Sequence, residues 1–261
     1  MHYRDLAISL AYQAGTIIKN NFQHNMVKEW KEDNSPVTLT DLAINQLVLD
    51  EIQAHYPSHS IMAEEGSKLQ ASEFVWVCDP VDGTTPFSHG IPNCVFALAL
   101  VHQGKSILST IYDPFLDRLF FAEAGQGAYL NQKRIYVNKQ ITLNRGLIGV
   151  VPSRRYPTLL KTIMQFARKE NIHIVSLGST IYMGMLVASG DLLASIFAGK
   201  KAHDSAALQV LIEEAGGQMT SLTGEAQPYD REVNGHLITN GQVHNDFLQV
   251  ISPALPSIRN L

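Results

Sequence analysis

Three apolar segments in the first half of the chain constrain the fold more than any other feature. Residues 95–102, 106–112 and 118–122 each have the length and composition of a β-strand, and the turn signals Gln103-Gly104 and Asp113-Pro114 separate them. Connections this short join antiparallel strands, because parallel neighbours need a crossover of about a dozen residues or more. The sequence therefore predicts an antiparallel sheet in the N-terminal half.

Helical periodicity precedes this sheet. Side chains recur on one face, at intervals of three, four and seven residues, in two segments. They are Leu6, Leu10, Ala14, Ile17 and Ile18 in the first segment, and Ile44, Leu47, Val48, Ile52 and His55 in the second, which stops at Pro57. We expect an exposed loop or hairpin in the polar stretch 28–36, and a short strand over residues 74–78 that ends at Asp79-Pro80.

The order of elements changes near residue 145. Strand-like segments at 147–151, 172–177 and 192–197 alternate with helical segments at 158–169 and 180–188. A further helix is expected to start at Asp204 and to stop at Gly216-Gly217. Such alternation indicates an α/β arrangement. We therefore expect a layered α/β chain with two units, residues 1–145 and 146–261, that pack together.

The composition excludes several classes of protein. A chain of 261 residues, 45% of them hydrophobic, can bury the core of one large domain or two subdomains. With 20 Lys and Arg against 24 Asp and Glu, no basic surplus indicates a nucleic-acid or membrane-surface partner. Two cysteines exclude a disulfide scaffold. Because there is neither a signal-peptide pattern nor an apolar run of membrane-spanning length, we expect a cytoplasmic protein.

The segment around Asp79 and Asp82 is the most informative for chemistry. A buried-type strand ends in these two carboxylates, and Gly83, Thr84 and Thr85 follow at once. Two carboxylates within about 4–6 Å raise each other's pKa unless a cation neutralises them, and hard oxygen ligands on a turn suit Mg²⁺. Gly83 lets the backbone approach a ligand, and N–H groups at a helix start hold an anion. A metal-assisted phosphoryl site is one interpretation; an ordinary Asp-Pro turn with a hydroxyl cap is the other.

Three other acidic positions could complete such a site. Glu64-Glu65 lies at a turn before the strand, Asp41 near the start of the second helix, and Asp204 at the start of a later one. Each also has a simpler interpretation, because Asp41 and Asp204 are suited to a helix start and Glu64-Glu65 to solvent. Taken one at a time, the simpler interpretation is favoured.

Several other motifs and residues are weaker evidence for function than they first suggest. Gly104-Lys105-Ser106 looks like the end of a phosphate-binding loop, but residue 99 is Ala where that motif needs Gly, so a hairpin turn is expected. The ten histidines show no zinc-binding spacing, and His203 is expected to pack or to form a hydrogen bond. Cys78 is expected to be a buried strand residue.

Separated motifs follow one another along the chain in an informative order. They are Glu64-Glu65, residues 79–85, Asp204-Ser205-Ala206-Ala207 and Glu214-Ala215-Gly216-Gly217, with lesser landmarks at residues 35–41, 55–60 and 125–128. From about residue 5 to about residue 245 the chain thereby resembles the inositol monophosphatase family of lithium-sensitive, Mg²⁺-dependent phosphatases. The resemblance implies an antiparallel N-terminal sheet and a smaller mixed C-terminal sheet between layers of helices.

The resemblance also implies a metal site with ligands from both units. Glu64, Asp79 and the backbone carbonyl of Val81 would hold one Mg²⁺. A second ion would lie between Asp79, Asp82 and Asp204, and Glu64 would serve a third, weaker position through water. The N-terminal unit would then carry most of the ligands, and the C-terminal unit would supply Asp204 and the substrate contacts.

Further residues are implied for the reaction itself. Thr84, paired with Asp41, would orient and help to deprotonate a metal-activated water, and Glu64 completes the implied catalytic set. The implied substrate contacts are the backbone N–H groups of Gly83, Thr84 and Thr85 for the phosphate, and Gly178, Ser179 and Thr180 for the alcohol part.

Departures from the family pattern bear on the substrate. Phe197 stands where animal members usually have a Glu that binds inositol hydroxyls, and His203 stands where many members have Trp. Hydrolysis of a small, inositol 1-phosphate-like ester is the default expectation; histidinol phosphate, fructose 1,6-bisphosphate and 3′-phosphoadenosine 5′-phosphate are alternatives. The resemblance also implies a homodimer. A non-enzymatic binding or regulatory protein is less favoured, because the acidic set is complete.

Overall fold

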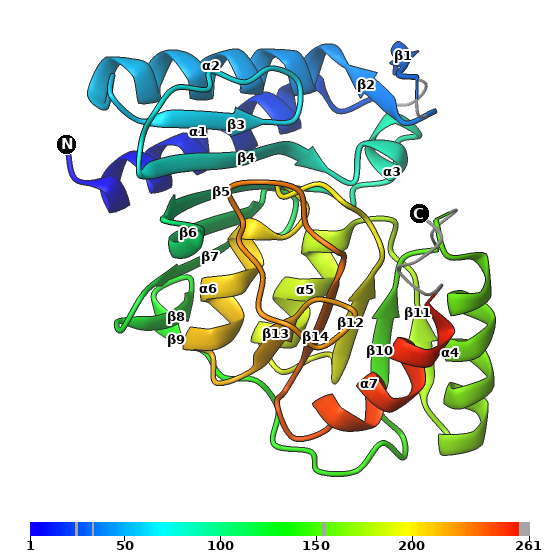
Figure 1. Ribbon diagram of the computed structural model, residues 1–261. Coiled ribbons are helices and arrows are strands. Elements are labelled where there is room, and N and C mark those ends of the chain that lie inside the picture. Colours follow the sequence, from blue (N-terminus) through cyan, green and yellow to red (C-terminus); the bar gives the residue numbers. More distant parts are fainter. Residues whose placement is uncertain (24–25, 33, 153–154, 256–261) are drawn as a thin grey trace.

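Helices and sheets alternate in layers throughout the computed structural model, which describes residues 1–23, 26–32, 34–152 and 155–255 (Figure 1). The helices are α1 (Tyr3–Asn21), α2 (Leu39–His55), α3 (Thr84–Ser88), α4 (Pro157–Glu170), α5 (Thr180–Ala188), α6 (Ala206–Glu214), α7 (His244–Ile251) and the short 3-10 helix η1 (Ser252–Ala254). Helices α1 and α2 form one outer layer, α5 and α6 lie between two sheets, and α4 and α7 form the other outer layer. The expected layered α/β fold is confirmed.

The larger sheet has seven strands in the order β3-β4-β5-β6-β7-β8-β9. Their bounds are β3 (Ser60–Ala63), β4 (Phe74–Asp82), β5 (Val95–His102), β6 (Lys105–Asp113), β7 (Arg118–Glu123), β8 (Gly127–Leu130) and β9 (Lys133–Arg134). Neighbours from β4 onward are antiparallel, as predicted. The prediction is wrong at the edge, where β3 pairs with β4 in parallel, because the connection 64–73 returns the chain to the same end of the sheet.

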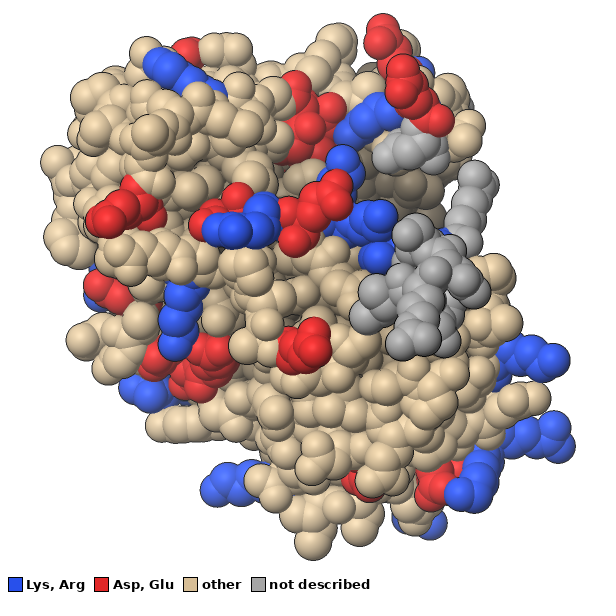
Figure 2. All heavy atoms as spheres, in the orientation of Figure 1, with Lys and Arg blue, Asp and Glu red and all other residues tan. Residues whose placement is uncertain are grey.

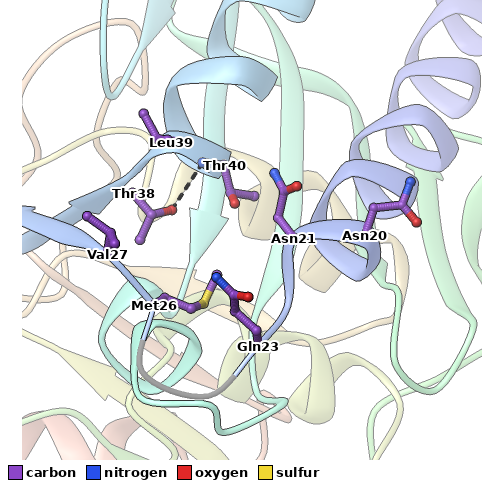
Figure 3. Close-up of a pocket in the computed structure, with 8 residues that line it drawn as sticks. All are labelled: Asn20, Asn21, Gln23, Met26, Val27, Thr38, Leu39 and Thr40. Carbon is purple, nitrogen blue, oxygen red and sulfur yellow. Dashed lines mark hydrogen bonds between the residues drawn. The ribbon is translucent and has the colours of Figure 1, made fainter.

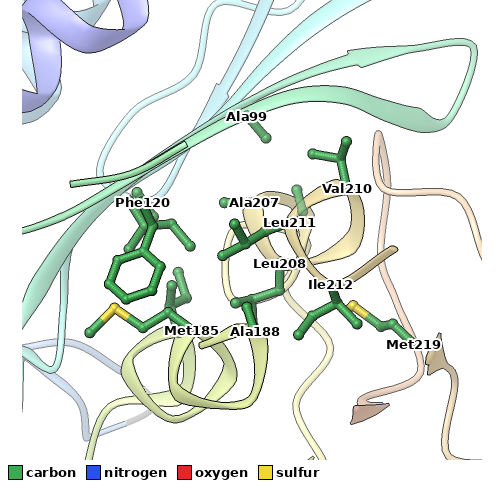
Figure 4. Packing of buried hydrophobic residues seen from close by; sticks show 14 of the residues in the cluster. Ala99, Phe120, Met185, Ala188, Ala207, Leu208, Val210, Leu211, Ile212 and Met219 are labelled. Atoms are coloured by element: carbon green, nitrogen blue, oxygen red, sulfur yellow. The ribbon is translucent and has the colours of Figure 1, made fainter. Parts of the chain in front are cut away.

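Both faces of this sheet are buried. Trp76 and Leu98 face α1 and α2, whereas Val77 and Ala99 face α5 and α6, as expected for side chains that alternate along a strand. Figure 4 shows the second contact, with Ala99 and Phe120 of the sheet above side chains of α5 and α6. Two-sided burial explains why these strands are apolar runs without a polar face.

The smaller sheet is mixed and has five strands in the order β11-β10-β12-β14-β13. Their bounds are β10 (Leu147–Val150), β11 (His173–Val175), β12 (Ala194–Phe197), β13 (Gln218–Thr220) and β14 (His236–Thr239). Strand β10 is parallel to β11 and β12, and β14 is antiparallel to β12 and β13. The mixed character matches the arrangement that the resemblance implied.

Two predicted boundaries are wrong at positions that matter for function. Strand β4 continues through Pro80 to Asp82, with an irregularity in register between Asp79 and Asp82. Proline is accommodated at such a bulge, because no ladder hydrogen bond from its nitrogen is needed there. Helix α6 begins at Ala206 with Ser205 at its N-cap, so Asp204 lies in the preceding turn. Asp82 at the bulge of β4 and Asp204 in the turn before α6 therefore both lie at irregular backbone positions.

The polar stretch between α1 and α2 forms a hairpin of β1 (Lys28–Trp30) and β2 (Pro36–Thr38), paired antiparallel. Residue 33 of this stretch lies outside the described residues. The hairpin stands close to α3 at one end of the larger sheet (Figure 1). Across the described ranges, none of the helices has the length and apolar character needed to cross a bilayer.

Candidate active site

A cleft opens where β4 ends, between the two sheets. It holds about 280 Å³ and is lined by Ser35, Pro36, Glu64, Asp79, Val81, Asp82, Gly83, Thr84, Thr85, Val151, Gly178, Thr180 and Asp204. Most of the site residues predicted from sequence are in this set, although more than a hundred residues separate Asp82 from Asp204 in the chain. Figure 2 shows acidic and basic side chains close together across the middle of the face in view.

A second hollow lies between the end of α1 and the start of α2 (Figure 3). Its described lining residues are Asn20, Asn21, Gln23, Met26, Val27, Thr38, Leu39 and Thr40. None of these side chains ionises near neutral pH, so they offer neither metal-binding carboxylates nor an acid–base pair. The cleft at the end of β4 is therefore the candidate active site.

Asp79 and Asp82 are buried at the bulge of β4 and are held by different donors. The backbone N–H of Val81 donates to Asp79 Oδ1 at 3.1 Å. Asp82 accepts hydrogen bonds from the start of α5: from the Ser179 hydroxyl, and from three backbone N–H groups. These are Thr180 at 3.1 Å, Ile181 at 2.8 Å and Tyr182 at 3.3 Å. Asp82 thus joins the larger sheet to the helix layer, and its donors are all neutral.

The carboxylates of Asp79, Asp82 and Asp204 form one cluster, the aspartate group. One oxygen from each lies within 4.8 Å of the others. Burial and then the charge of Glu64 raise the pKa of Asp79 well above its ordinary value, and burial and then Asp82 do the same for Asp204. Burial raises the pKa of Asp82 to about 6, although its hydrogen bonds act in the opposite direction. Such a cluster stays fully ionised at neutral pH only beside a cation.

Asp41 caps the start of α2 and is also linked to the cleft through Thr84. Its Oδ2 accepts from the backbone N–H of Thr38 at 2.9 Å and from the Thr38 hydroxyl, which forms a capping box at the start of α2. Its Oδ1 accepts from the Thr84 hydroxyl at 3.1 Å, and that hydroxyl also lies 2.9 Å from the Val81 carbonyl oxygen. The capping and the functional interpretations of Asp41 are therefore compatible. Burial raises the pKa of this carboxyl.

Glu64 and Glu65, the glutamate pair, share one cation. The Lys31 ammonium lies 2.6 Å from Glu64 Oε1 and 2.5 Å from Glu65 Oε1, and all three side chains are partly buried. Burial lowers the pKa of Lys31, but the two carboxylates outweigh it and leave the pKa above its usual value. The solvent-exposed interpretation of this pair is wrong. Lys31 was not predicted as a site residue, because the polar residues around it in the sequence do not indicate an ion pair with residues more than thirty positions away.

His203 precedes Asp204 and lies at the edge of the cluster. A ring nitrogen of His203 and one oxygen each of Glu64 and Asp79 lie within 4.8 Å of one another. Burial lowers the pKa of His203 to about 4, so its imidazole is neutral at pH 7. A neutral imidazole offers a lone pair to a metal ion.

Two glycines allow the backbone to enclose the cleft. Gly83 has a φ of +95°, and a Cβ there would lie 2.6 Å from the Asn93 carbonyl oxygen. It precedes α3, whose first N–H groups have no acceptor within the helix. Gly178, with a φ of +72°, precedes Ser179 at the N-cap of α5. These backbone conformations place the start of α3, which follows β4 of the larger sheet, and the start of α5, which follows β11 of the smaller sheet, beside the carboxylates.

Three residues singled out from the sequence do not line the cleft. Asp41 reaches it through Thr84, and Ser179 stands behind Asp82. The ring of Phe197 contacts Gly199, where a Cβ would lie 2.1 Å from the Phe197 Cζ, and lies 5.3 Å from the His236 ring. Of the motifs given less weight, Gly104 lies in the β5–β6 turn with Lys105 as the first residue of β6, and Cys78 is buried in β4, both as expected.

Comparison with known proteins gives a consistent result. The chain matches the inositol monophosphatase family over residues 2–254. It is 30% identical to the Nus factor SuhB of Pasteurella multocida, over 96% of both chains. It is also 30% identical to a fructose-1,6-bisphosphatase/inositol-1-monophosphatase of Thermotoga maritima, over 85% of this chain and 84% of the other. The solved structure of a Thermotoga maritima IMPase superimposes with a TM-score of 0.88 at 27% identity, over 97% of this chain and 98% of that one.

Proposed function

Because the chain belongs to the inositol monophosphatase family, we propose that it is a Mg²⁺-dependent phosphomonoesterase that hydrolyses a small, inositol 1-phosphate-like ester. Family membership supports phosphatase activity in general. The proposal rests mainly on one observation, which is that Glu64, Asp79, Asp82 and Asp204 converge on one cleft. The start of α3 beside these carboxylates can bind the phosphate, whereas the first N–H groups of α5 already donate to Asp82.

The donor set is suited to Mg²⁺. It consists of carboxylates and one backbone carbonyl, which are hard oxygen ligands. Asp79, Asp82 and Asp204 would hold one ion, and Glu64, Asp79 and the Val81 carbonyl another, so that Asp79 is shared. When bound, Mg²⁺ lowers the pKa of water and neutralises charge on the reacting phosphoryl oxygens. Burial, and then the neighbouring carboxylates, raise the pKa values of Asp79 and Asp204, as expected for a metal site without its cation.

Thr84 and Asp41 would handle the proton of the attacking water. When the Thr84 hydroxyl donates to Asp41 Oδ1, its oxygen lone pairs face the cleft as acceptors. A water that donates to Thr84 is thereby oriented, and its proton can pass through the hydroxyl to Asp41. The raised pKa of Asp41 favours this direction of transfer. Asp41 is itself fixed by Thr38, so the relay is anchored at the start of α2.

The phosphate would lie at the start of α3. The N–H groups of Gly83, Thr84 and Thr85 stand at this helix start, where donors lack partners within the helix. Their position beside the carboxylates allows a phosphate to bridge amide donors and bound Mg²⁺. Phosphoryl transfer needs mainly positioning and charge neutralisation, and this arrangement supplies both.

The alcohol part of the substrate would face Gly178 and Thr180. Both line the cleft, whereas the Ser179 hydroxyl is engaged by Asp82 and by the Tyr182 N–H. Ser179 would therefore contact a substrate through its backbone only. In this proposal residues 1–145 form a subdomain with most metal ligands, and residues 146–261 form one that supplies Asp204 and the substrate contacts. A homodimer is proposed from the family resemblance alone, and a mass measurement in solution tests it.

Phosphate release from a substrate panel tests the proposed function. The panel contains inositol 1-phosphate, histidinol phosphate, fructose 1,6-bisphosphate, 3′-phosphoadenosine 5′-phosphate and glycerol 2-phosphate, each with Mg²⁺ and with EDTA. We expect Mg²⁺-dependent release, with the best substrate among the small monoesters. Because Phe197 replaces the Glu of animal members, histidinol phosphate, fructose 1,6-bisphosphate and 3′-phosphoadenosine 5′-phosphate are the alternatives. Release that persists in EDTA would contradict the metal mechanism.

A regulatory role is the second candidate, because one relative is named a Nus factor. The complete acidic set favours catalysis, since a purely regulatory protein has no need to bury several carboxylates together, where burial and then mutual repulsion raise their pKa values. Lack of release from every member of the panel, in a protein that still binds Mg²⁺, would favour this second candidate.

A further inference from the structure

His203 is partly buried, and its surroundings differ from those of the buried histidines. His236 lies 2.8 Å from the Ser205 hydroxyl, His244 lies 3.0 Å from the Thr220 hydroxyl, and His59 accepts from the Trp76 indole at 3.1 Å. The expectation from sequence was that His203 packs or forms a hydrogen bond; within the described part of the chain its ring takes part in no hydrogen bond. Its charged neighbours are the carboxylates of Glu64 and Asp79 and the ammonium groups of Lys201 and Lys31.

We propose that His203 is a nitrogen ligand of the metal site and that, with Glu64 and Asp79, it forms a position that prefers Mn²⁺ to Mg²⁺. This inference rests on the metal site of the proposed function. The three ligand atoms lie within 4.8 Å of one another. Ligand atoms on one ion at about 2.1 Å are about 3.0 Å apart when adjacent and about 4.2 Å apart when opposite, so the three side chains would move closer together when the ion binds. The three residues come from the ends of β3 and β4 and from the turn before α6, which span both sheets.

The ligand types separate this position from the aspartate group. Asp79, Asp82 and Asp204 offer oxygen only, which suits Mg²⁺. Replacing one oxygen by an imidazole nitrogen favours first-row transition ions, for which affinity is higher and dehydration easier. Asp79 belongs to both groups and would bridge two unlike ions. The cleft would then hold Mg²⁺ among the aspartates and a transition ion beside His203.

Lys31 leaves room for this ion. Its ammonium lies 2.6 Å from Glu64 Oε1, so Glu64 Oε2 is the oxygen left to coordinate a metal. A positive charge at this distance weakens the binding of any cation to Glu64. The imidazole of His203 adds a neutral donor on the other side and compensates in part. This balance predicts a position that exchanges its ion readily rather than one that is permanently occupied.

Electron spin-echo envelope modulation on the Mn²⁺-loaded protein tests the assignment. We expect ¹⁴N modulation from one imidazole in the wild-type protein, loss of that modulation in His203→Gln, and its retention in His55→Gln, in which an exposed histidine of α2 is changed. Titration of the same proteins should show Mn²⁺ affinity at this position reduced about tenfold or more by His203→Gln, with Mg²⁺ affinity nearly unchanged.

The outcomes separate this inference from the proposed function. Bound Mn²⁺ without ¹⁴N modulation in the wild-type protein would overturn the role of His203 and leave the carboxylate site intact. This readout needs no variant, so it holds even if His203→Gln folds poorly. Modulation that persists in a folded His203→Gln would also overturn it. Failure of Mn²⁺ and Mg²⁺ to bind at all would contradict the proposed function as well.

Discussion

The aspartate group and the glutamate pair both hold carboxylates close together, but different groups compensate for the repulsion between them. Asp82 is surrounded by neutral donors from α5, which fix its position without cancelling its charge. Glu64 and Glu65 are neutralised directly by Lys31. Neutral donors leave the charge of the aspartate group to be balanced by a metal ion, whereas the Lys31 ammonium already balances part of the charge of the glutamate pair. We therefore expect the aspartate group to hold its metal ion tightly and the glutamate pair to exchange its cation.

Asp82→Asn should have the largest effect. The change removes one negative charge from the aspartate group, while the remaining side-chain oxygen can still accept hydrogen bonds from α5. We expect turnover to fall about 10³-fold, as for the loss of a main electrostatic stabiliser. Phosphate release and circular dichroism measure activity and folding separately. Asp50→Asn, an exposed change on α2, is the matched control, and turnover near wild type in Asp82→Asn would remove Asp82 from the mechanism.

Thr84→Val should have the next largest effect. It removes the hydroxyl that joins the cleft to Asp41 but keeps a similar volume. We expect kcat to fall about 10²-fold with little change in KM, because proton handling is lost and substrate contacts remain. Thr84→Ser keeps the hydroxyl and should retain most of the activity. Equal losses in the two variants would contradict the proposed role of the hydroxyl, because only Thr84→Val removes it, and loss in Thr84→Ser alone would mean that packing of the methyl group is what matters.

Mg²⁺ binding should depend on pH. Burial raises the pKa of Asp82 from 3.8 to about 6, so between these values the folded, metal-free protein keeps a proton that the unfolded chain has lost. That proton stabilises the folded state, and its contribution is lost as the pH rises through about 6. Mg²⁺ competes with the same proton, so its affinity should rise about tenfold per pH unit below this pKa.

The quantity to measure is the difference in Tm with and without Mg²⁺ at each pH. The Tm alone is not suitable, because the buried histidines change it with pH in the opposite direction. Burial lowers the pKa of His236 to about 3 and of His244 to about 4, so both favour folding as the pH rises. We expect the Mg²⁺-induced shift to grow from pH 5 to pH 7. A shift that is constant over this range would indicate that no proton is displaced from the aspartate group.

Lys31→Gln should have the smallest effect. Removing the ammonium leaves Glu64 and Glu65 without their cation and makes this side of the cleft more negative. Metal affinity at Glu64 should rise a few-fold, because the lost charge is partly exposed and screened by solvent. Calorimetric titration with Mn²⁺ measures it, and Lys68→Gln is a control on another partly buried lysine nearby. Weaker binding in Lys31→Gln would contradict the idea that Lys31 competes with the metal.

The part of the fold that the sequence predicted has local causes. Strands β5, β6 and β7 were predicted because they are buried on both faces and joined by short turns. The parallel pairing of β3 was missed, since it depends on the course of residues 64–73 through space. Strands β13 and β14 were not predicted either, because they are only three and four residues long and pair across the intervening loop 221–235.

The candidate site divides in the same way. The segment from Asp79 to Thr85 carries local evidence for a metal and a phosphate, because the carboxylates, glycine and hydroxyls are adjacent. No local pattern connects Asp204 to Asp82, so that contact came from the family resemblance and is observed as a carboxylate cluster. Lys31 and His203 approach Glu64 from opposite ends of the chain, and only the folded structure brings them together.

Anomalous diffraction from crystals grown with Mn²⁺ and inorganic phosphate tests the central claim most directly. We expect one Mn²⁺ between Asp79, Asp82 and Asp204 and a second beside Glu64 and Asp79, with phosphate at the start of α3. Mn²⁺ absent from this cleft, or phosphate bound elsewhere in a protein that still releases phosphate from its substrate, would contradict the claim that these carboxylates form the catalytic metal site.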